Sequence, residues 1–148
     1  MMLGVGTPVA AAGETPAVGT GRRDAADDPE IWADPANRAR GMILGTDKQA
    51  GLYVYDLTGR QIQFLAEGRL NNVDLRSDFP AEGRGQILIG ASNRSAGGIS
   101  FFLADPAAPG APVVRVRMNG GGRGSAIVPV ASDGTIALGT SAGGTDLT

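Results

Sequence analysis

The sequence predicts an all-β protein built from many short strands, and three observations support this prediction. Apolar residues make up 42% of the 148 residues, which is enough to form a folded core. The chain contains 24 Gly and 9 Pro, so it turns often and favours short strands over long helices. From Asp24 onward, short apolar runs alternate with turn residues, and no segment has a helical period.

The chain divides into a leading segment and a region of strands. Residues 1–23 are rich in Gly, Ala, Pro and Thr and have no periodicity, so we expect a leader or flexible arm. Residues 24–148 form the predicted domain, in which turns such as Thr58-Gly59 and Asp105-Pro106 separate the strands. The predicted strands, in order, are 30–32, 42–45, 52–56, 61–65, 73–75, 86–91, 98–103, 113–116, 125–130 and 135–140.

An internal repeat indicates how these strands are arranged. The sequence MILGT at 42–46 recurs as ILIGA at 87–91 and as IALGT at 136–140, and Gly51, Gly97 and Gly143 follow at intervals of 46 residues. A period of about 46 residues with about four short strands is typical of a β-propeller blade. The alternative is chance recurrence in a Gly-rich chain. On the propeller interpretation the chain holds two blades and part of a third, so further blades or other copies are needed to close the ring.

Charge and composition exclude several kinds of function. The net charge of −2 argues against a nucleic-acid-binding protein, which normally has a basic face. The chain has no Cys and no His, so it has no thiol nucleophile, zinc thiolate site or disulfide, and it lacks the commonest general base. A bound metal must therefore be held by oxygen atoms, which favours Ca²⁺ or Mg²⁺.

The sequence also bears on the location of the protein. No stretch is long and apolar enough to cross a bilayer, so no membrane association is expected. Residues 3–12 are apolar and end in small residues, like the end of a secretory signal, although a basic region before them is missing. We therefore expect a secreted or periplasmic protein, with an ordinary chain start as the alternative.

Charged residues recur with the period of the repeat. Asp28 and Asp74 are 46 residues apart, and so are Lys48 and Arg94. Equivalent positions in neighbouring blades lie on one face, so we expect two carboxylates and two cations to meet there. The alternative for each residue alone is a solvated turn residue. Neither cation is spaced to pair with a neighbouring carboxylate on a helix, so a structural salt bridge is not the obvious alternative for them.

These residues suit a metal and a phosphate. Oxygen donors occur in two short segments, at 24–29 and 71–74, in which Ca²⁺ could be held by side-chain and backbone oxygens. Asx-rich turns also form without a metal, which is the alternative. Lys48 offers a compact charge and Arg94 a bidentate fork, and both suit a phosphate group. The candidate metal ligands are Asp27, Asp28, Pro29, Asn72, Val73 and Asp74.

Five motifs in order resemble the opening blades of the β-propeller phytases. They are DAADDPEIW at 24–32, GTDK at 45–48, GLYVYDL at 51–57, GRLNNVDLR at 68–76 and ASNRS at 91–95. The resemblance covers residues 24–103, and residues 104–148 add nothing that aligns with the family.

The resemblance implies a six-bladed propeller with several bound Ca²⁺ ions, which hydrolyses the phosphate monoesters of phytate to lower inositol phosphates, as a 3-phytase does. It implies that Asp28, Pro29 and Val73 bind calcium, with Asn72 and Asp74 close by. It implies that Lys48 and Arg94 bind phosphate at the catalytic site. The family completes its site from later blades, so we expect this chain alone to be weak or inactive. The alternative is a non-catalytic propeller module that binds calcium or an anion.

Overall fold

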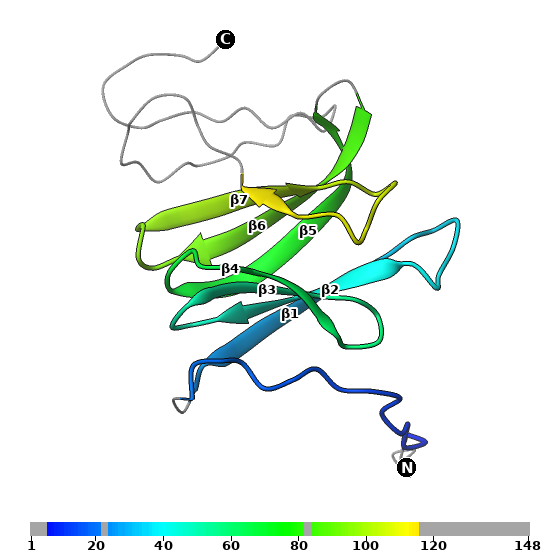
Figure 1. The fold of residues 1–148 in the computed structure, drawn as a ribbon, viewed down its shortest axis with the longest axis horizontal. Helices are drawn as coiled ribbons and strands as arrows, with labels where there is room; N and C mark the ends of the chain where they lie inside the picture. Colours follow the sequence, from blue (N-terminus) through cyan, green and yellow to red (C-terminus); the bar gives the residue numbers. More distant parts are fainter. Residues whose placement is uncertain (1–5, 22–23, 82–83, 116–148) are drawn as a thin grey trace, which may run out of the picture.

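A computed structural model describes residues 6–21, 24–81 and 84–115, and all regular elements in these ranges are β-strands. The first sheet contains β1 (Ala26–Ala33), β2 (Gly41–Asp47), β3 (Gly51–Tyr55) and β4 (Gln61–Leu65). The second contains β5 (Leu70–Ala81), β6 (Arg84–Asn93), β7 (Gly98–Ala104) and β8 (Val114–Arg115). Each sheet is a four-stranded antiparallel meander, and the two sheets stack on each other (Figure 1).

The all-β prediction is confirmed, and most predicted strands are present. The strand expected at 61–65 matches β4, whereas β1 and β5 extend well beyond their predicted ranges. Asn71 and Asn72, which precede the strand predicted at 73–75, lie within β5. The strands expected at 125–130 and 135–140, with the third copy of the repeat, lie outside the described residues. The closed propeller stays a prediction.

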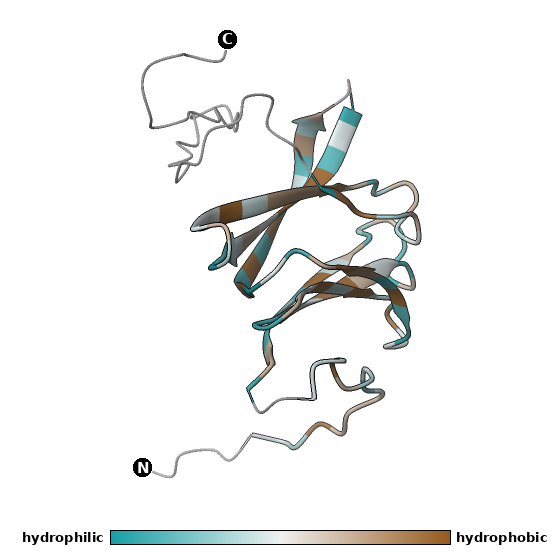
Figure 2. Cartoon of the chain, turned by 60° about the vertical axis from the view of Figure 1, so that its left-hand side comes forward, coloured by the Kyte–Doolittle hydropathy of each residue, from teal (hydrophilic) through white to brown (hydrophobic). Residues whose placement is uncertain are grey.

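The hydrophobic core lies between the two sheets. Leu44 and Val54 from the first sheet and Ile89 and Phe102 from the second are fully buried in one cluster. Hydrophobic residues, brown in Figure 2, occur along the strands of both sheets. Burying one such side chain contributes about 1.5–3 kcal/mol. The shared core therefore makes the two sheets stabilise each other.

The two sheets repeat the same construction at one edge. Ala26 pairs with Asp47 and Leu70 pairs with Asn93, and in both sheets a bulge follows. The N–H of Asp28 donates to Thr46 Oγ1 at 3.0 Å, as the N–H of Asn72 donates to Ser92 Oγ at 3.1 Å. These matching contacts show which residues of the two sheets are structurally equivalent, whatever their separation in the sequence.

This geometry corrects one expectation and supports another. Asp28 corresponds to Asn72, so the expectation that Asp28 and Asp74 are equivalent is wrong. The reason is that the chain from Leu70 to Asn93 is two residues longer than the chain from Ala26 to Asp47. By contrast, Lys48 and Arg94 are equivalent, because each directly follows the last residue of β2 or β6.

The leading segment contacts the first sheet, although residues 6–21 have no regular secondary structure. The N–H of Gly19 donates to the Tyr53 hydroxyl at 2.8 Å, and Thr20 Oγ1 donates to Asp47 Oδ2 at 2.7 Å. Tyr53 stacks on Tyr55, on the face of β3 opposite the core residues Leu52 and Val54. This segment therefore runs beneath the first sheet, on the side away from the second (Figure 1).

Candidate functional site

The candidate site lies at the edge where β2 turns into β3 and β6 turns into β7. A buried Asx side chain ends β2 and β6 and caps the turn that follows. The Oδ1 atom of Asp47 accepts the N–H of Gln49 at 2.7 Å, and Oδ1 of Asn93 accepts the N–H of Ser95 at 2.9 Å. Such side-chain caps stabilise a tight turn without help from a regular ladder. The turns therefore hold the backbones of Lys48 and Arg94 in fixed positions.

Lys48 forms two ion pairs across the first sheet. Its Nζ lies 2.7 Å from Asp24 Oδ1 and 3.1 Å from Asp27 Oδ1. The hydrogen bond that Lys48 Nζ donates to Asp24 Oδ1 raises the pKa of Lys48, and the same bond lowers the pKa of Asp24. A structural salt bridge, which was not the obvious alternative from the sequence spacing, is therefore present at Lys48. The pairing of β1 with β2 brings these carboxylates close, and sequence spacing alone does not reveal it.

Arg94 differs from Lys48 in having no carboxylate partner among the residues that the structure describes. It is exposed and forms no ion pair with any residue in the described ranges. The pKa of Asp24 is lowered mainly by its hydrogen bond to Lys48, and the charge of Arg94 also contributes to this lowering. Arg94 is therefore close enough to influence the first turn while its guanidinium stays available to an anion.

Asp28 joins the two sheets at this edge. Its Oδ2 accepts the N–H of Val73 at 3.0 Å, and Thr46 Oγ1 hydrogen bonds to its backbone. Its Oδ1 accepts no hydrogen bond from the described part of the chain. The structure thus brings together two predicted metal ligands, Asp28 and Val73, with Pro29 next in the chain.

The other predicted ligands are placed differently. Asp27 holds Lys48, and Asp74 Oδ1 accepts the N–H of Leu75 at 2.8 Å. Asn72 is exposed, and its Oδ1 accepts a hydrogen bond from Asn71 Nδ2 at 3.0 Å. Within the described ranges, no group of three Asp, Glu, His or Cys side chains could hold a metal ion. These residues therefore supply only part of an oxygen-donor set.

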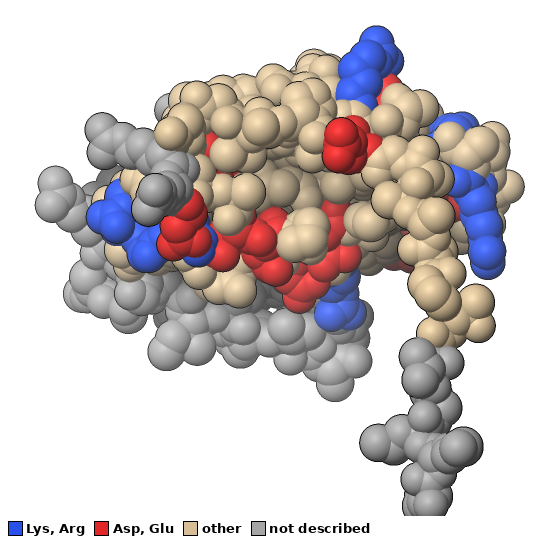
Figure 3. All heavy atoms as spheres, turned by 90° about the horizontal axis from the view of Figure 1, so that it is seen from below, with Lys and Arg blue, Asp and Glu red and all other residues tan. Residues whose placement is uncertain are grey.

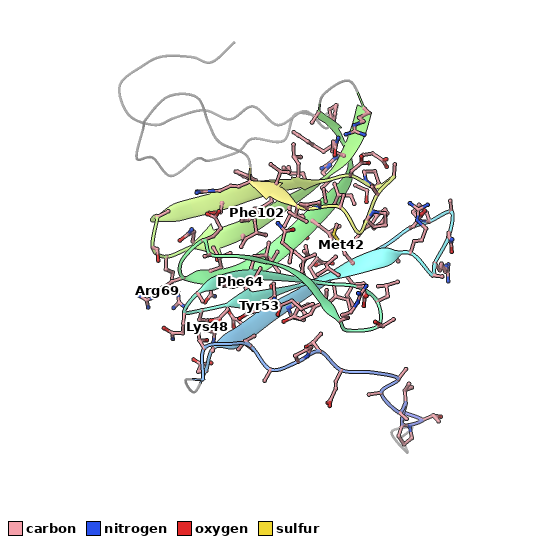
Figure 4. The ribbon with its side chains drawn as sticks, viewed as in Figure 1. Met42, Lys48, Tyr53, Phe64, Arg69 and Phe102 are labelled. Carbon is pink, nitrogen blue, oxygen red and sulfur yellow. The ribbon has the colours of Figure 1, made fainter. Side chains whose placement is uncertain are left out.

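Charge is unevenly distributed around the site. Viewed from below, acidic side chains form a band across the first sheet, with basic side chains at its left-hand end (Figure 3). Figure 4 places Lys48 and Arg69 at this same edge of the two sheets. A cavity of about 110 Å³ lies elsewhere, lined by Ile62, Gln63 and 110–112, and it has no charged side chain. The candidate site is therefore an open edge rather than a closed pocket.

Sequence reasoning missed three residues of this edge. Asp24 is the closer partner of Lys48, Thr46 supports Asp28, and Ser95 Oγ accepts the N–H of Arg69 at 2.9 Å. All three residues lie inside the motifs quoted above, so the motifs pointed to the right segments but not to these contacts.

Together the fold and the site define a class of protein. It is an all-β protein built from repeated four-stranded antiparallel sheets, with oxygen donors and cations gathered at one edge. No helix capable of crossing a membrane occurs in the part of the chain that the structure describes.

Comparison with known proteins gives the family. The sequence matches the family described as Phytase over residues 6–107. It is also 48% identical, over 84 residues, to a protein of Bacillus subtilis (strain 168) named 3-phytase. The match covers 57% of this chain and 22% of that relative. The chain belongs to the phytase family, and the resemblance seen in the motifs is confirmed.

Proposed function

We propose that this chain takes part in the calcium-dependent hydrolysis of phytate to lower inositol phosphates and phosphate. One observation carries the proposal: Lys48 and Arg94 occupy equivalent turns at the edge where Asp28 meets Val73. Cations beside oxygen donors suit a phosphate monoester, because the two cations and a metal held by the oxygen donors can together neutralise its negative charge. The family and the relative named 3-phytase support this substrate.

The donor chemistry fits calcium. Asp28 has one carboxylate oxygen outside the hydrogen bond to Val73, and the backbone carbonyls of Pro29 and Val73 are oxygen donors of the kind Ca²⁺ accepts. When bound, calcium supplies positive charge against the phosphate and promotes ionisation of water. The donors present are fewer than the six to eight that Ca²⁺ takes. We propose that residues of further blades or of other copies supply the remaining calcium ligands.

The chain's own residues would bind and orient the phosphate. Lys48 contributes a compact ammonium and Arg94 a planar fork with two parallel donors. In the absence of substrate, Asp24 and Asp27 hold Lys48 in place. A phosphate carries more charge than one carboxylate, so it can displace Asp24, which is 78% exposed. The neighbouring Asp27 then keeps the ammonium oriented.

We propose that the two sheets are blades of a larger propeller of six. The match covers 22% of the Bacillus relative. The edge is open to water, where charge interactions are several-fold weaker than in a closed site. The 148 residues alone should therefore release phosphate far more slowly than the full-length Bacillus protein.

Phosphate release from phytate tests the proposal. We expect slow release that needs calcium and stops with a chelator. Lys48→Ala and Arg94→Ala should each reduce it about ten- to hundredfold, the cost of a charge-assisted contact. Arg38→Ala and Arg60→Ala are matched controls and should change little, because solvent screens these exposed cations.

Two outcomes would contradict the proposal. Release that continues unchanged in the chelator would exclude the calcium requirement. If all four substitutions behaved alike, Lys48 and Arg94 would be ordinary turn cations. Phytate binding without any release would instead favour the alternative, a non-catalytic module that binds calcium or an anion.

A further inference from the structure

The two equivalent turns differ in charge, although their backbones are the same. The N–H of Lys48 donates to the carbonyl of Ala25 at 2.7 Å, and the N–H of Arg94 donates to the carbonyl of Arg69 at 2.9 Å. Arg69 therefore stands where the first sheet has Ala25. The preceding residues match as well, because Asp24 has a φ of 62° and Gly68 a φ of 83°.

The first turn is internally neutralised, whereas the second is not. Lys48 has carboxylate partners in Asp24 and Asp27. The equivalent positions in the second sheet are Gly68 and Asn71, which carry no charge. The second turn thus has two cations, Arg69 and Arg94, and no carboxylate in its corresponding positions.

Arg69 and Arg94 are also free to bind. Both are exposed, and neither forms an ion pair within the ranges that the structure describes. Five of the other cations in those ranges are each paired with a carboxylate. One backbone hydrogen bond joins the two residues, so their cationic side chains start from neighbouring points of the backbone, and an anion is attracted to such a pair.

The backbone beneath Arg69 is firmly held. Ser95 Oγ accepts the N–H of Arg69 at 2.9 Å, and Asn93 Nδ2 donates to the carbonyl of Glu67 at 2.8 Å. Gly68 is tightly packed, because a Cβ there would lie 2.7 Å from Ser95 Oγ. Arg69 therefore projects from a fixed support, and its placement next to Arg94 is a built feature of the turn.

We propose that Arg69 is a further phosphate-binding residue, which together with Arg94 grips a phosphate group of the substrate. The inference rests on the proposed function, since it places Arg69 in the same phosphate-binding edge. It adds a residue that lies outside the repeated Lys48 and Arg94 positions. The guanidinium of Arg69 would donate to phosphate oxygens from the side of the β4–β5 connection, while Arg94 donates from the β6–β7 turn.

Phytate binding by the 148-residue protein tests this inference, with isothermal titration calorimetry at fixed calcium and ionic strength. Arg69→Ala installs the residue that the first sheet carries at the equivalent place, so the backbone should tolerate it. We expect the dissociation constant of the Arg69→Ala variant for phytate to be about three- to tenfold higher than that of the unaltered protein, as for the loss of a partly screened charged contact. Arg69→Lys keeps the charge and should recover part of the affinity.

Arg38→Ala is the matched control, because Arg38 is also exposed and without an ion pair in the described ranges, but lies in the loop between β1 and β2. It should leave the dissociation constant unchanged, and circular dichroism should show all variants folded. If Arg94→Ala weakens binding and Arg69→Ala does not, the inference is wrong while the proposed function stands. If neither substitution weakens binding, or the unaltered protein does not bind phytate, both are wrong.

Discussion

At the scale of single residues, hydrogen bonds to carboxylates decide the local structure. Asp56 shows this in the turn between β3 and β4. Its Oδ1 accepts from Thr58 Oγ1 at 2.5 Å and from the Thr58 N–H at 2.9 Å, and its Oδ2 accepts from Arg60 Nε at 3.0 Å. These bonds, with the one from the Thr58 hydroxyl largest, lower the pKa of Asp56 to about 2.

This pKa leads to a pH-dependent prediction. A carboxyl with a lowered folded-state pKa stabilises the fold above its ordinary pKa of 3.8, and the contribution is lost as the pH falls through about 2. Thr58→Ala removes the largest cause, so the pKa of Asp56 should rise toward 3.8. Carbon-detected NMR titration of the carboxyl measures it, with Thr58→Ser as the control that keeps the hydroxyl. A midpoint near 3.8 in the unaltered protein would contradict this account.

At the scale of elements, strand positions could be read from the sequence but their register could not. The apolar runs and turn residues located most strands, because burial and turn chemistry leave local signals. The sequence repeat matched Leu44 with Ile89, and the structure shows both residues buried in the core. They reach that core from different sheets that face each other. The repeat pairs these two residues 45 positions apart, whereas the equivalent turns after β2 and β6 are 46 positions apart. A slip of one residue exchanges the two faces of a strand.

The candidate site was predictable to a similar degree. The motifs selected Lys48, Arg94 and Asp28 as candidates, because their residue types suit phosphate and calcium, and their role stays a prediction. The pairing of Lys48 with Asp24 and Asp27 could not be predicted, since it depends on which strands are neighbours. The hydrogen bond from Val73 to Asp28 spans 45 residues and needs both sheets in place. Neither the ion pairs of Lys48 nor this hydrogen bond can be read from the local sequence.

The shared core gives a prediction at this scale. Phe102 on β7 is fully buried in the cluster to which both sheets contribute, so Phe102→Ala should lower the free energy of unfolding by about 3–5 kcal/mol. Phe64→Ala on β4 is the same chemical change at a side chain that is 39% exposed. Because Phe64 contacts Tyr53 with ring centroids 4.5 Å apart, its loss should be about 1 kcal/mol. Urea denaturation measures both, and equal losses would show that the sheets do not share a core.

At the scale of the whole molecule, two kinds of contact hold the sheets together. The hydrophobic core lies between them, and polar contacts connect their margins. Arg40 Nη2 donates to the carbonyls of Pro106 and Ala107, and Gln63 exchanges two hydrogen bonds with the backbone of Val113. At the edge that carries the candidate site, Asp28 reaches Val73 across the same junction. The proposed metal site thus lies where one sheet meets the next.

Thermal unfolding with calcium and with a chelator tests this central claim most directly. A metal that binds only the folded protein stabilises it by about 2.7 kcal/mol at a hundredfold excess over its dissociation constant. We predict that calcium raises the melting temperature of the unaltered protein, and that Asp28→Asn, which keeps the shape but removes the charge, abolishes most of the increase. Asp105→Asn is the control, because Asp105 pairs with Arg84 away from this edge, and it should respond to calcium normally. Superimposable melting curves with and without calcium would contradict the account.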